Sequence, residues 1–227
     1  MRIDSEFSKY ANHYGRYNII QEKVAKRLLS HIDSQPQNIL DLGCGRGAIV
    51  EKIDWEYKHF VGVDFAKGML ELHPKSPSIE CIHGDFNDPK LYEELRKQKF
   101  DYVVSSSALQ WAEDLEGVIK NIQSLATPVS LAVFTSGTFE SLHKTASIEP
   151  LLRSKDELYK IQKKYIDGNF EVVNYRLEFE NTREMFRYIK KSGVSGSRNL
   201  LSYKQTKQLM EEYPLDYLEF EVVFIYS

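Results

Sequence analysis

Short apolar runs alternate with amphipathic stretches along this 227-residue chain. The runs that we interpret as strands lie at residues 39–42, 59–64, 81–86, 100–106 and 130–135. Between them, residues 18–32 and 115–125 repeat apolar side chains at helical spacing, and Asp114 is placed to cap the second helix. Strands that alternate with helices favour a doubly wound parallel sheet, so we predict an α/β fold.

The chain beyond residue 135 continues this alternation with a different ending. Ser154 and Glu157 have the spacing of a capping box and predict the start of a helix. We predict a sixth strand at residues 172–179 and a short basic helix at 182–191, which Gly193 stops. A further helix begins at residues 202–205, and an apolar last strand covers residues 218–226.

The first predicted strand runs into three glycines at alternate positions, Gly43, Gly45 and Gly47. Without a Cβ, the backbone there adopts positive φ angles and a ligand lies directly against it, while the strand turns sharply into a helix. The pattern is G-x-G-x-G with Asp41 two residues ahead, whereas the dinucleotide fingerprint is G-x-G-x-x-G. The loop therefore predicts a nucleotide site other than the dinucleotide type.

Three later strand ends also carry polar residues. Asp64 ends the second strand 17 residues after Gly47, beside the glycine turn, where it accepts both hydroxyls of a ribose. The third strand ends at Asp85, and the fourth opens into the small residues before Trp111. The sequence therefore predicts a nucleoside site at this edge of the sheet.

The glycine loop and the polar ends of the second, third and fourth strands, in this order, resemble the motifs of the class I S-adenosylmethionine-dependent methyltransferases. The resemblance implies a Rossmann-like fold with a seven-stranded, mostly parallel sheet, an antiparallel last strand and helices on both faces. It implies S-adenosylmethionine as cofactor, with Asp41 ordering the loop, Asp64 holding the ribose, and Asp85 with the Phe86 amide facing the adenine. Phe86 departs from the commoner small residue of the family. The implied cofactor residues are Gln21, Asp41, Gly43, Cys44, Gly45, Asp64, Phe65, Met69, Asp85, Phe86 and Ser106, with Arg46 beside Gln21 near the methionine carboxylate.

Residues 108–111, 133–138, 186–194 and 215–226, with the aromatic N-terminus, are similar to the malonyl-acyl-carrier-protein O-methyltransferases of biotin synthesis. This resemblance implies methylation of the free carboxylate of malonyl-acyl-carrier protein. The Leu-Gln-Trp element is shared with trans-aconitate methyltransferases, so a small free carboxylic acid stays as an alternative acceptor. A cofactor-binding subunit without catalysis is an alternative of another class.

A carboxylate is nucleophilic at neutral pH and needs no general base, so a dry pocket with a guanidinium and phenol hydroxyls suits it. The aromatic residues 7–17 are either such a lid or a helix over the sheet edge, and Trp111 is either a substrate wall or a core plug. The candidate catalytic residues are Tyr14, Tyr10 and Trp111. The candidate substrate or partner residues are Arg16, Tyr17, Gln110, His143, Arg187, Lys190 and Arg198.

Charge is unevenly distributed behind a net charge of −3. Residues 41–140 hold 10 Lys and Arg against 16 Asp and Glu, whereas residues 141–210 hold 14 against 8. The basic region is either a solvated face or a dock for an acidic partner such as acyl carrier protein. It has no dense Lys/Arg stripe interleaved with aromatics, which disfavours nucleic acid as a partner.

Length and composition fit one methyltransferase domain over residues 1–227. We divide it into an N-terminal lid and helix (1–37), a cofactor-binding core (38–135), and an insertion with the last strands (136–227). The sequence has no membrane-length apolar segment and no signal-peptide core, so we expect a cytoplasmic protein without a membrane partner. Only two cysteines occur, so we expect no disulfide and no metal site, and we expect a monomer.

Overall fold

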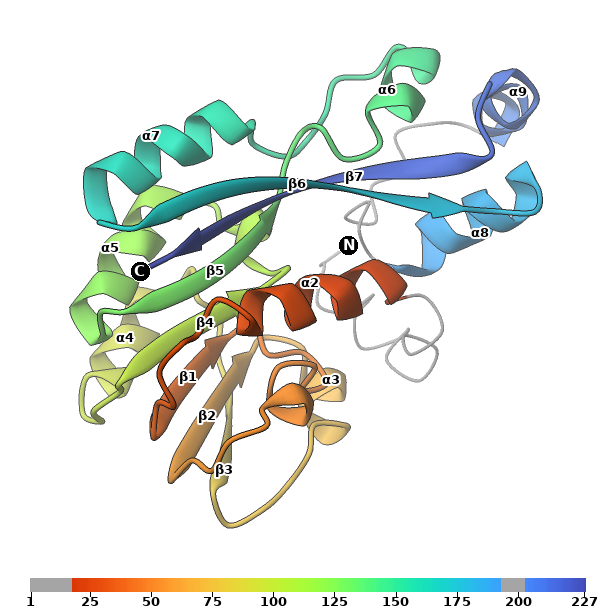
Figure 1. Cartoon of the computed structure of the whole chain (residues 1–227). Helices are drawn as coiled ribbons and strands as arrows, with labels where there is room; N and C mark the ends of the chain where they lie inside the picture. Colours follow the sequence, from red (N-terminus) through yellow and green to blue (C-terminus); the bar gives the residue numbers. More distant parts are fainter. Residues whose placement is uncertain (1–17, 193–202) are drawn as a thin grey trace.

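The computed structural model describes residues 18–192 and 203–227. These residues fold around a seven-stranded sheet in the order β3-β2-β1-β4-β5-β7-β6 (Figure 1). The first five strands pair in parallel, as the sequence predicts. They are β1 (Asn38–Leu42), β2 (His59–Asp64), β3 (Ile79–His83), β4 (Tyr102–Ser106) and β5 (Val129–Phe134).

The last two strands are longer than the others. β6 (Asn169–Glu178) pairs with β7 (Tyr217–Tyr226) over its whole length, while β5 pairs only with residues 222–226 of β7. β7 runs antiparallel to both of its neighbours, which confirms the predicted direction of the last strand. The first half of β7 therefore extends past the end of β5 as a two-stranded arm with β6.

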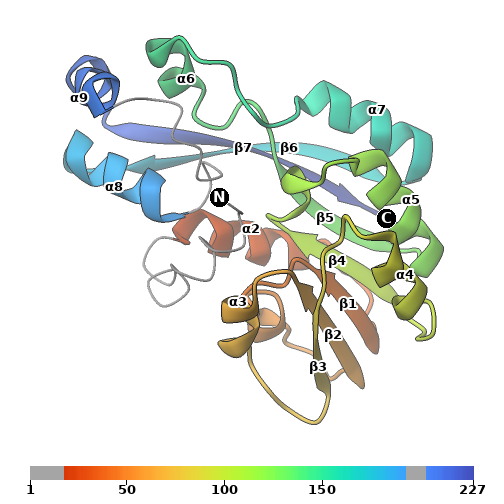
Figure 2. The same cartoon turned by 180° about the vertical axis from the view of Figure 1, so that it is seen from behind.

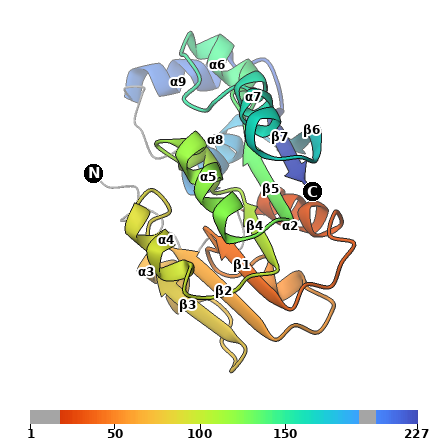
Figure 3. The same cartoon turned by 90° about the vertical axis from the view of Figure 1, so that its left-hand side faces the viewer.

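Helices cover both faces of the sheet, and in Figure 3 α2 and α5 lie on opposite sides of β4 and β5. Because strand side chains alternate, β1 gives Ile39 to one apolar cluster and Leu40 to the other. The first cluster includes residues of α2 (Ile19–Leu29), α6 (Glu140–Ala146), α8 (Thr182–Ser192) and α9 (Tyr203–Glu212). The second includes α4 (Pro89–Leu95), α5 (Leu115–Leu125) and α7 (Lys155–Tyr165), as the view from behind shows (Figure 2).

Side-chain caps set the start of three of these helices. The Asp114 carboxylate accepts a hydrogen bond from the Gly117 N–H at the start of α5, as predicted. Ser154 and Glu157 form a complete capping box at the start of α7, which also confirms the prediction. Asp88 caps α4 in the same way, so local chemistry defines where these helices begin.

The helix predicted directly after the glycine loop is wrong in extent. The chain forms turns and then a 3₁₀ helix of three residues, η2 (Val50–Lys52). Residues 48–58 are a short connection to β2, and the Trp55 indole donates to the Pro36 carbonyl at 3.2 Å, which holds the connection beside the start of β1. η2 packs against α2, which precedes β1 in the chain and also contacts β4 and β5.

Neither cysteine forms a disulfide: Cys44 is buried and Cys81 is exposed on the edge strand β3. Within residues 18–192 and 203–227, no helix combines the length and the apolar character that crossing a bilayer requires.

Candidate active site

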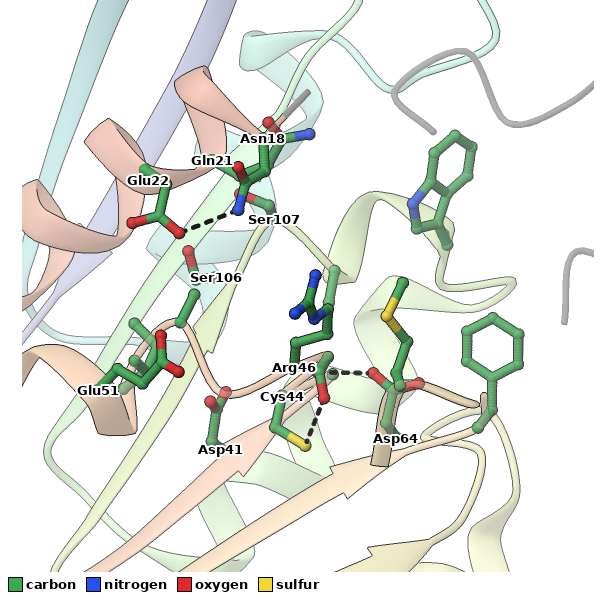
Figure 4. A pocket seen from close by; sticks show the side chains of 18 of the residues that line it. Asn18, Gln21, Glu22, Asp41, Cys44, Arg46, Glu51, Asp64, Ser106 and Ser107 are labelled. Atoms are coloured by element: carbon green, nitrogen blue, oxygen red, sulfur yellow. Dashed lines mark hydrogen bonds between the residues drawn. The ribbon is translucent and has the colours of Figure 1, made fainter. Parts of the chain in front are cut away.

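A cavity of about 290 Å³ lies at the carboxyl ends of β1, β2 and β4 (Figure 4). β1 sits between β2 and β4 in the sheet, so the connections on its two sides run in opposite directions. This switch point is where open α/β sheets bind their ligands. The lining residues are Asn18, Gln21, Glu22, Asp41, Gly43, Cys44, Gly45, Arg46, Ala48, Ile49, Glu51, Asp64, Phe65, Met69, Phe86, Ser106, Ser107, Ala108 and Trp111.

The glycine loop forms the floor of this cavity, and its glycines differ in what they approach. Gly43 has φ +79° and a Cβ built there would lie 2.2 Å from the Ala108 Cβ, so it permits close packing against the β4 exit. Gly45 has φ +55°, and no atom lies within 4 Å of the corresponding Cβ position. The open side of Gly45 is therefore where the backbone itself is accessible to a ligand.

Asp64, at the end of β2, holds the glycine loop in place. Its Oδ2 accepts a hydrogen bond from the Gly45 N–H at 2.9 Å, and its Oδ1 accepts one from the Ala66 N–H at 2.8 Å. The Val63 carbonyl also accepts from the Gly43 N–H at 2.8 Å. Asp64 therefore ties the end of β2 to the glycine loop on one side and to the start of the next connection on the other.

Asp41 is the most unusual polar group in this cavity. It is 1% exposed, and neither carboxyl oxygen has a hydrogen-bond partner among the described residues. Burial, with a smaller contribution from the Asp64 charge, raises the pKa of Asp41 well above its ordinary value. No hydrogen bond joins Asp41 to the loop in the described chain, so the loop-ordering role expected from the sequence is not carried by such a bond.

The ionisable side chains of the cavity lining are mostly acidic. The lining contains the carboxyl groups of Glu22, Asp41, Glu51 and Asp64 but a single guanidinium, that of Arg46. Lys52, outside the lining, forms an ion pair with Glu22 and offsets part of this charge. An acidic, concave and partly desolvated site concentrates cations.

Most cofactor residues predicted from the sequence meet in this cavity. The exception is Asp85, which is exposed and absent from the lining. Its Oδ1 accepts hydrogen bonds from the Asn87 backbone and side-chain N–H groups, both at 2.9 Å, so it stabilises its own turn. The predicted residues that do line the cavity are Gln21, Asp41, Gly43, Cys44, Gly45, Asp64, Phe65, Met69, Phe86 and Ser106, together with Arg46.

The exit of β4 brings Trp111 to the cavity but turns Gln110 away from it. Trp111 ends the 3₁₀ helix η3 (Leu109–Trp111), is half-buried, lines the cavity and also packs against the second apolar cluster. Gln110 is buried, and its Nε2 donates to the Ser107 carbonyl at 2.6 Å. Successive residues of a 3₁₀ turn point in different directions, which explains why two neighbours have different roles.

Arg153, which the sequence patterns did not single out, holds the far end of this segment. Its Nη2 donates to the Ala112 carbonyl at 2.8 Å and to the Glu113 carbonyl at 3.0 Å. Its own carbonyl accepts from the Ser136 N–H at the β5 exit. An isolated arginine before a helix carries no sequence signal for such contacts, because both partners are backbone groups that are distant in the chain.

We expect Arg153→Ala to release the segment that carries Trp111. Loss of the two hydrogen bonds should lower the free energy of unfolding by about 1–2 kcal/mol. In a Trp55→Phe background Trp111 is the sole tryptophan, and its emission should shift to longer wavelength with lower anisotropy. Arg96→Ala is the control, because Arg96 bonds Asn121 and Ser124 away from the cavity. Equal emission spectra for the two variants would contradict this role of Arg153.

Of the remaining acceptor-side candidates, those that the structure describes lie outside the cavity lining. His143 lies on α6 in a second cavity of about 620 Å³ with Lys155 and Glu221, and burial lowers the pKa of its imidazole. The chain reaches this position because the Phe139 N–H bonds the Glu219 carbonyl and draws α6 toward β7. Arg187 is exposed on α8, and the backbone of Lys190 belongs to the same helix. The residues outside the described chain are Tyr10, Tyr14, Arg16, Tyr17 and Arg198.

The cavity fits a nucleoside that carries a positive charge. Asp41 presents a buried carboxyl without a hydrogen-bond partner in the described chain, Gly45 presents open backbone, and the ionisable side chains of the lining are mostly acidic. A cationic ligand would supply the interaction that the buried Asp41 carboxyl lacks.

Comparisons with known proteins agree with this geometry. Residues 40–134, which contain the glycine loop, Asp64 and the β4 exit, match the family model of the methyltransferase domain. A malonyl-[acyl-carrier protein] O-methyltransferase of Bacillus cereus is 28% identical over 91% of this chain and 85% of its own length. One of the same name from Halalkalibacterium halodurans is 27% identical over 92% of this chain and 88% of its own length.

Solved structures show the same fold at lower identity. A structure from Bacillus halodurans assigned to the methyltransferases has a TM-score of 0.61 at 12% identity, covering 90% of this chain and 97% of its own. The plantazolicin methyltransferase BpumL, solved with S-adenosylhomocysteine (SAH) and a monoazolic desmethylPZN analogue, has a TM-score of 0.53 at 12% identity. That comparison covers 97% of this chain and 88% of the other.

Proposed function

We propose, from the premise that this chain is a class I S-adenosylmethionine-dependent methyltransferase, that it methylates the free carboxylate of malonyl-acyl-carrier protein in synthesis of the pimeloyl precursor of biotin. The observation that carries the proposal is the similarity to two enzymes of that name over about nine-tenths of the chain. The cavity supplies the cofactor side of the reaction.

The lining of the cavity suits an acceptor that needs no base. S-adenosylmethionine, when bound, supplies a methyl group on a sulfonium sulfur, which leaves as a neutral thioether when an acceptor oxygen attacks. A malonyl carboxylate is already ionised at neutral pH, so the protein has to orient it and exclude water. No histidine, lysine or tyrosine occurs among the described residues of the lining, which is consistent with such an acceptor.

We assign the cofactor roles from the geometry of the cavity. Asp64, at the end of β2 in the lining, holds the ribose hydroxyls, and the open backbone at Gly45 lies against the ligand. Phe86, which is buried and lines the cavity, provides an apolar wall for the adenine. Asp41 meets the cationic part of the cofactor, and Arg46 with Gln21 meets its carboxylate.

The proposed dock for the acidic carrier protein is α8. Arg183 and Arg187 are exposed and lie four residues apart, on one side of the helix, and no ion pair of either is found within the described residues. Met185 and Tyr188 anchor α8 in the apolar cluster that also contains α2, whose first turn lines the cavity. Lys190 extends the same helix. Such a surface mainly accelerates encounter with an acidic partner.

Reversing charge on this dock should weaken recognition of the carrier. We expect Arg183→Glu with Arg187→Glu to raise KM for malonyl-carrier protein about fivefold at low salt and to reduce its salt dependence. The matched control is Lys160→Glu with Lys163→Glu, which changes the same charge on the exposed face of α7. Malonyl-coenzyme A, which lacks the carrier surface, should be used equally well by all three proteins. An unchanged salt dependence in the α8 variant would argue against the dock.

The test of the function is methyl transfer by the purified protein from S-adenosylmethionine to three acceptors side by side. Malonyl-carrier protein, malonyl-coenzyme A and trans-aconitate are offered at equal concentration, and the products are identified by mass. Preference for malonyl-carrier protein is the expected result. Turnover of trans-aconitate alone would assign a small free acid as acceptor. Cofactor binding without turnover of any carboxylate would leave the noncatalytic partner subunit as the function.

A further inference from the structure

Ser107 stands at the β4 exit in a conformation that serine rarely adopts. Its φ is +59°, in the left-handed region that favours glycine. Both sides of the residue are fixed: its N–H donates to the Ala132 carbonyl of β5 at 2.9 Å, and its carbonyl accepts from the buried Gln110 Nε2 at 2.6 Å. Neighbouring structure therefore imposes a strained backbone at a residue that lines the cavity.

The Ser107 hydroxyl takes part in no hydrogen bond within the described residues, although its Oγ is buried. Ser107 lines the same cavity as Gln21 and Asn18, and Figure 4 draws these three side chains away from Asp64. A buried hydroxyl without a partner costs stability, so its position in a binding cavity points to a ligand.

The charges around the cavity restrict which ligand group it meets. A cationic group of a ligand would find four carboxyl side chains in the lining and would not need a hydroxyl. A carboxylate has few donors there: the Arg46 guanidinium, two side-chain amides and the hydroxyls of Ser106 and Ser107. One of the amides is engaged, because Asn18 Nδ2 donates to Glu22 at 3.0 Å. The ligand group that gains most from the Ser107 hydroxyl as a hydrogen-bond donor is therefore a carboxylate.

We infer that the Ser107 hydroxyl donates a hydrogen bond to a carboxylate bound in this cavity. Two sources carry that group: the methyl acceptor, if it is the malonyl group proposed above, and the methionyl part of the cofactor. Gln110 is a positioning residue, which acts by holding the Ser107 carbonyl and with it the left-handed turn.

The experiment compares Ser107→Gly with Ser107→Ala. Glycine adopts the left-handed conformation without strain, whereas alanine keeps the strain, and both remove the hydroxyl. Calorimetry gives Kd for S-adenosylmethionine and SAH, and steady-state kinetics give KM for malonyl-carrier protein. We expect one of these two constants, the cofactor Kd or the KM for malonyl-carrier protein, to increase about tenfold, and by the same factor in both variants. A weaker Kd for both cofactor forms assigns the methionyl carboxylate, and a higher KM alone assigns the acceptor.

Ser147 provides the matched control, since it is a second left-handed serine, with φ +51°, at the end of α6 and outside this cavity. The difference in melting temperature between Ser147→Gly and Ser147→Ala measures the effect of backbone strain alone. The difference between Ser107→Gly and Ser107→Ala should be the same. Activity that is lost in Ser107→Ala and retained in Ser107→Gly would overturn the inference, as would unchanged Kd and KM in both. If the wild type methylates no carboxylate, the proposed function fails, and an unchanged cofactor Kd in the variants then overturns this inference as well.

Discussion

Replacing Asp41 with asparagine is expected to raise the stability of the empty protein and to weaken binding of S-adenosylmethionine by about tenfold or more. The carboxyl of Asp41 is buried with no hydrogen-bond partner in the described chain and lies near the charge of Asp64. An amide of the same shape removes the charge from this environment. The same change removes the anion that we assign to the cationic part of the cofactor.

The stability gain from Asp41→Asn should depend on pH. Burial raises the pKa of Asp41 in the folded protein well above its value in the unfolded chain, so the folded state binds the proton more tightly. Wild-type stability therefore falls as pH rises above the unfolded pKa of about 3.9 and toward the folded pKa. Denaturant titrations should show a larger gain at about pH 7 than at about pH 4.5.

Cofactor binding provides an independent measure of the same group. If Asp41 ionises when the cation binds, the wild type releases a proton, and its affinity increases with pH. Calorimetry in buffers of different ionisation enthalpy measures this proton, which Asp41→Asn should not release. Asp88→Asn is the control, because asparagine also caps α4 and Asp88 is not among the cavity residues. Cofactor affinity equal to that of the wild type in Asp41→Asn would contradict the assignment.

Gly45→Ala is expected to abolish most cofactor affinity at a small cost in stability. The Cβ would meet no protein atom within 4 Å, so the cost is that of a left-handed alanine, about 1 kcal/mol. The added methyl would point into the open space where we place the ligand. Titration with SAH should show Kd increased by about tenfold or more, since a ligand in contact with the backbone has to move.

Gly43→Ala separates ligand contact from folding. Here the Cβ would lie 2.2 Å from the Ala108 Cβ at φ +79°, so the β4 exit has to shift. We expect a loss of about 3 kcal/mol in the free energy of unfolding, from overpacking and the left-handed conformation together. Denaturant unfolding of the two variants side by side makes the comparison. Normal SAH binding by Gly45→Ala would show that the ligand does not lie against this glycine.

Local sequence information was sufficient for the elements whose stabilising contacts are close in the chain. The continuous apolar run that ends at Asp64 identifies β2, and the cap at Asp114 identifies the start of α5, because each depends on a few neighbouring residues. It was insufficient for the segment after the glycine loop. There, the chain forms only the short η2 in contact with α2, and the local pattern contains no information about this packing between separate segments.

The sequence by itself determined the α/β fold class of this protein and the edge of the sheet where its cavity lies. The glycine loop, Asp64 and the strand ends each depend on residue type and spacing along a strand, and the parallel sheet then has to bring them to one edge. The order of the strands turns these separate signals into a single cavity.

The tertiary structure alone decided how individual side chains are used. It left Asp41 without a hydrogen-bond partner in the described chain, turned Gln110 to the Ser107 carbonyl, and brought Arg153 from a distant segment to the Trp111 turn. It also kept Asp85 outside the cavity, in a turn of its own. These outcomes depend on partners far apart in sequence or on which way a single turn faces, and residue spacing carries no information about either.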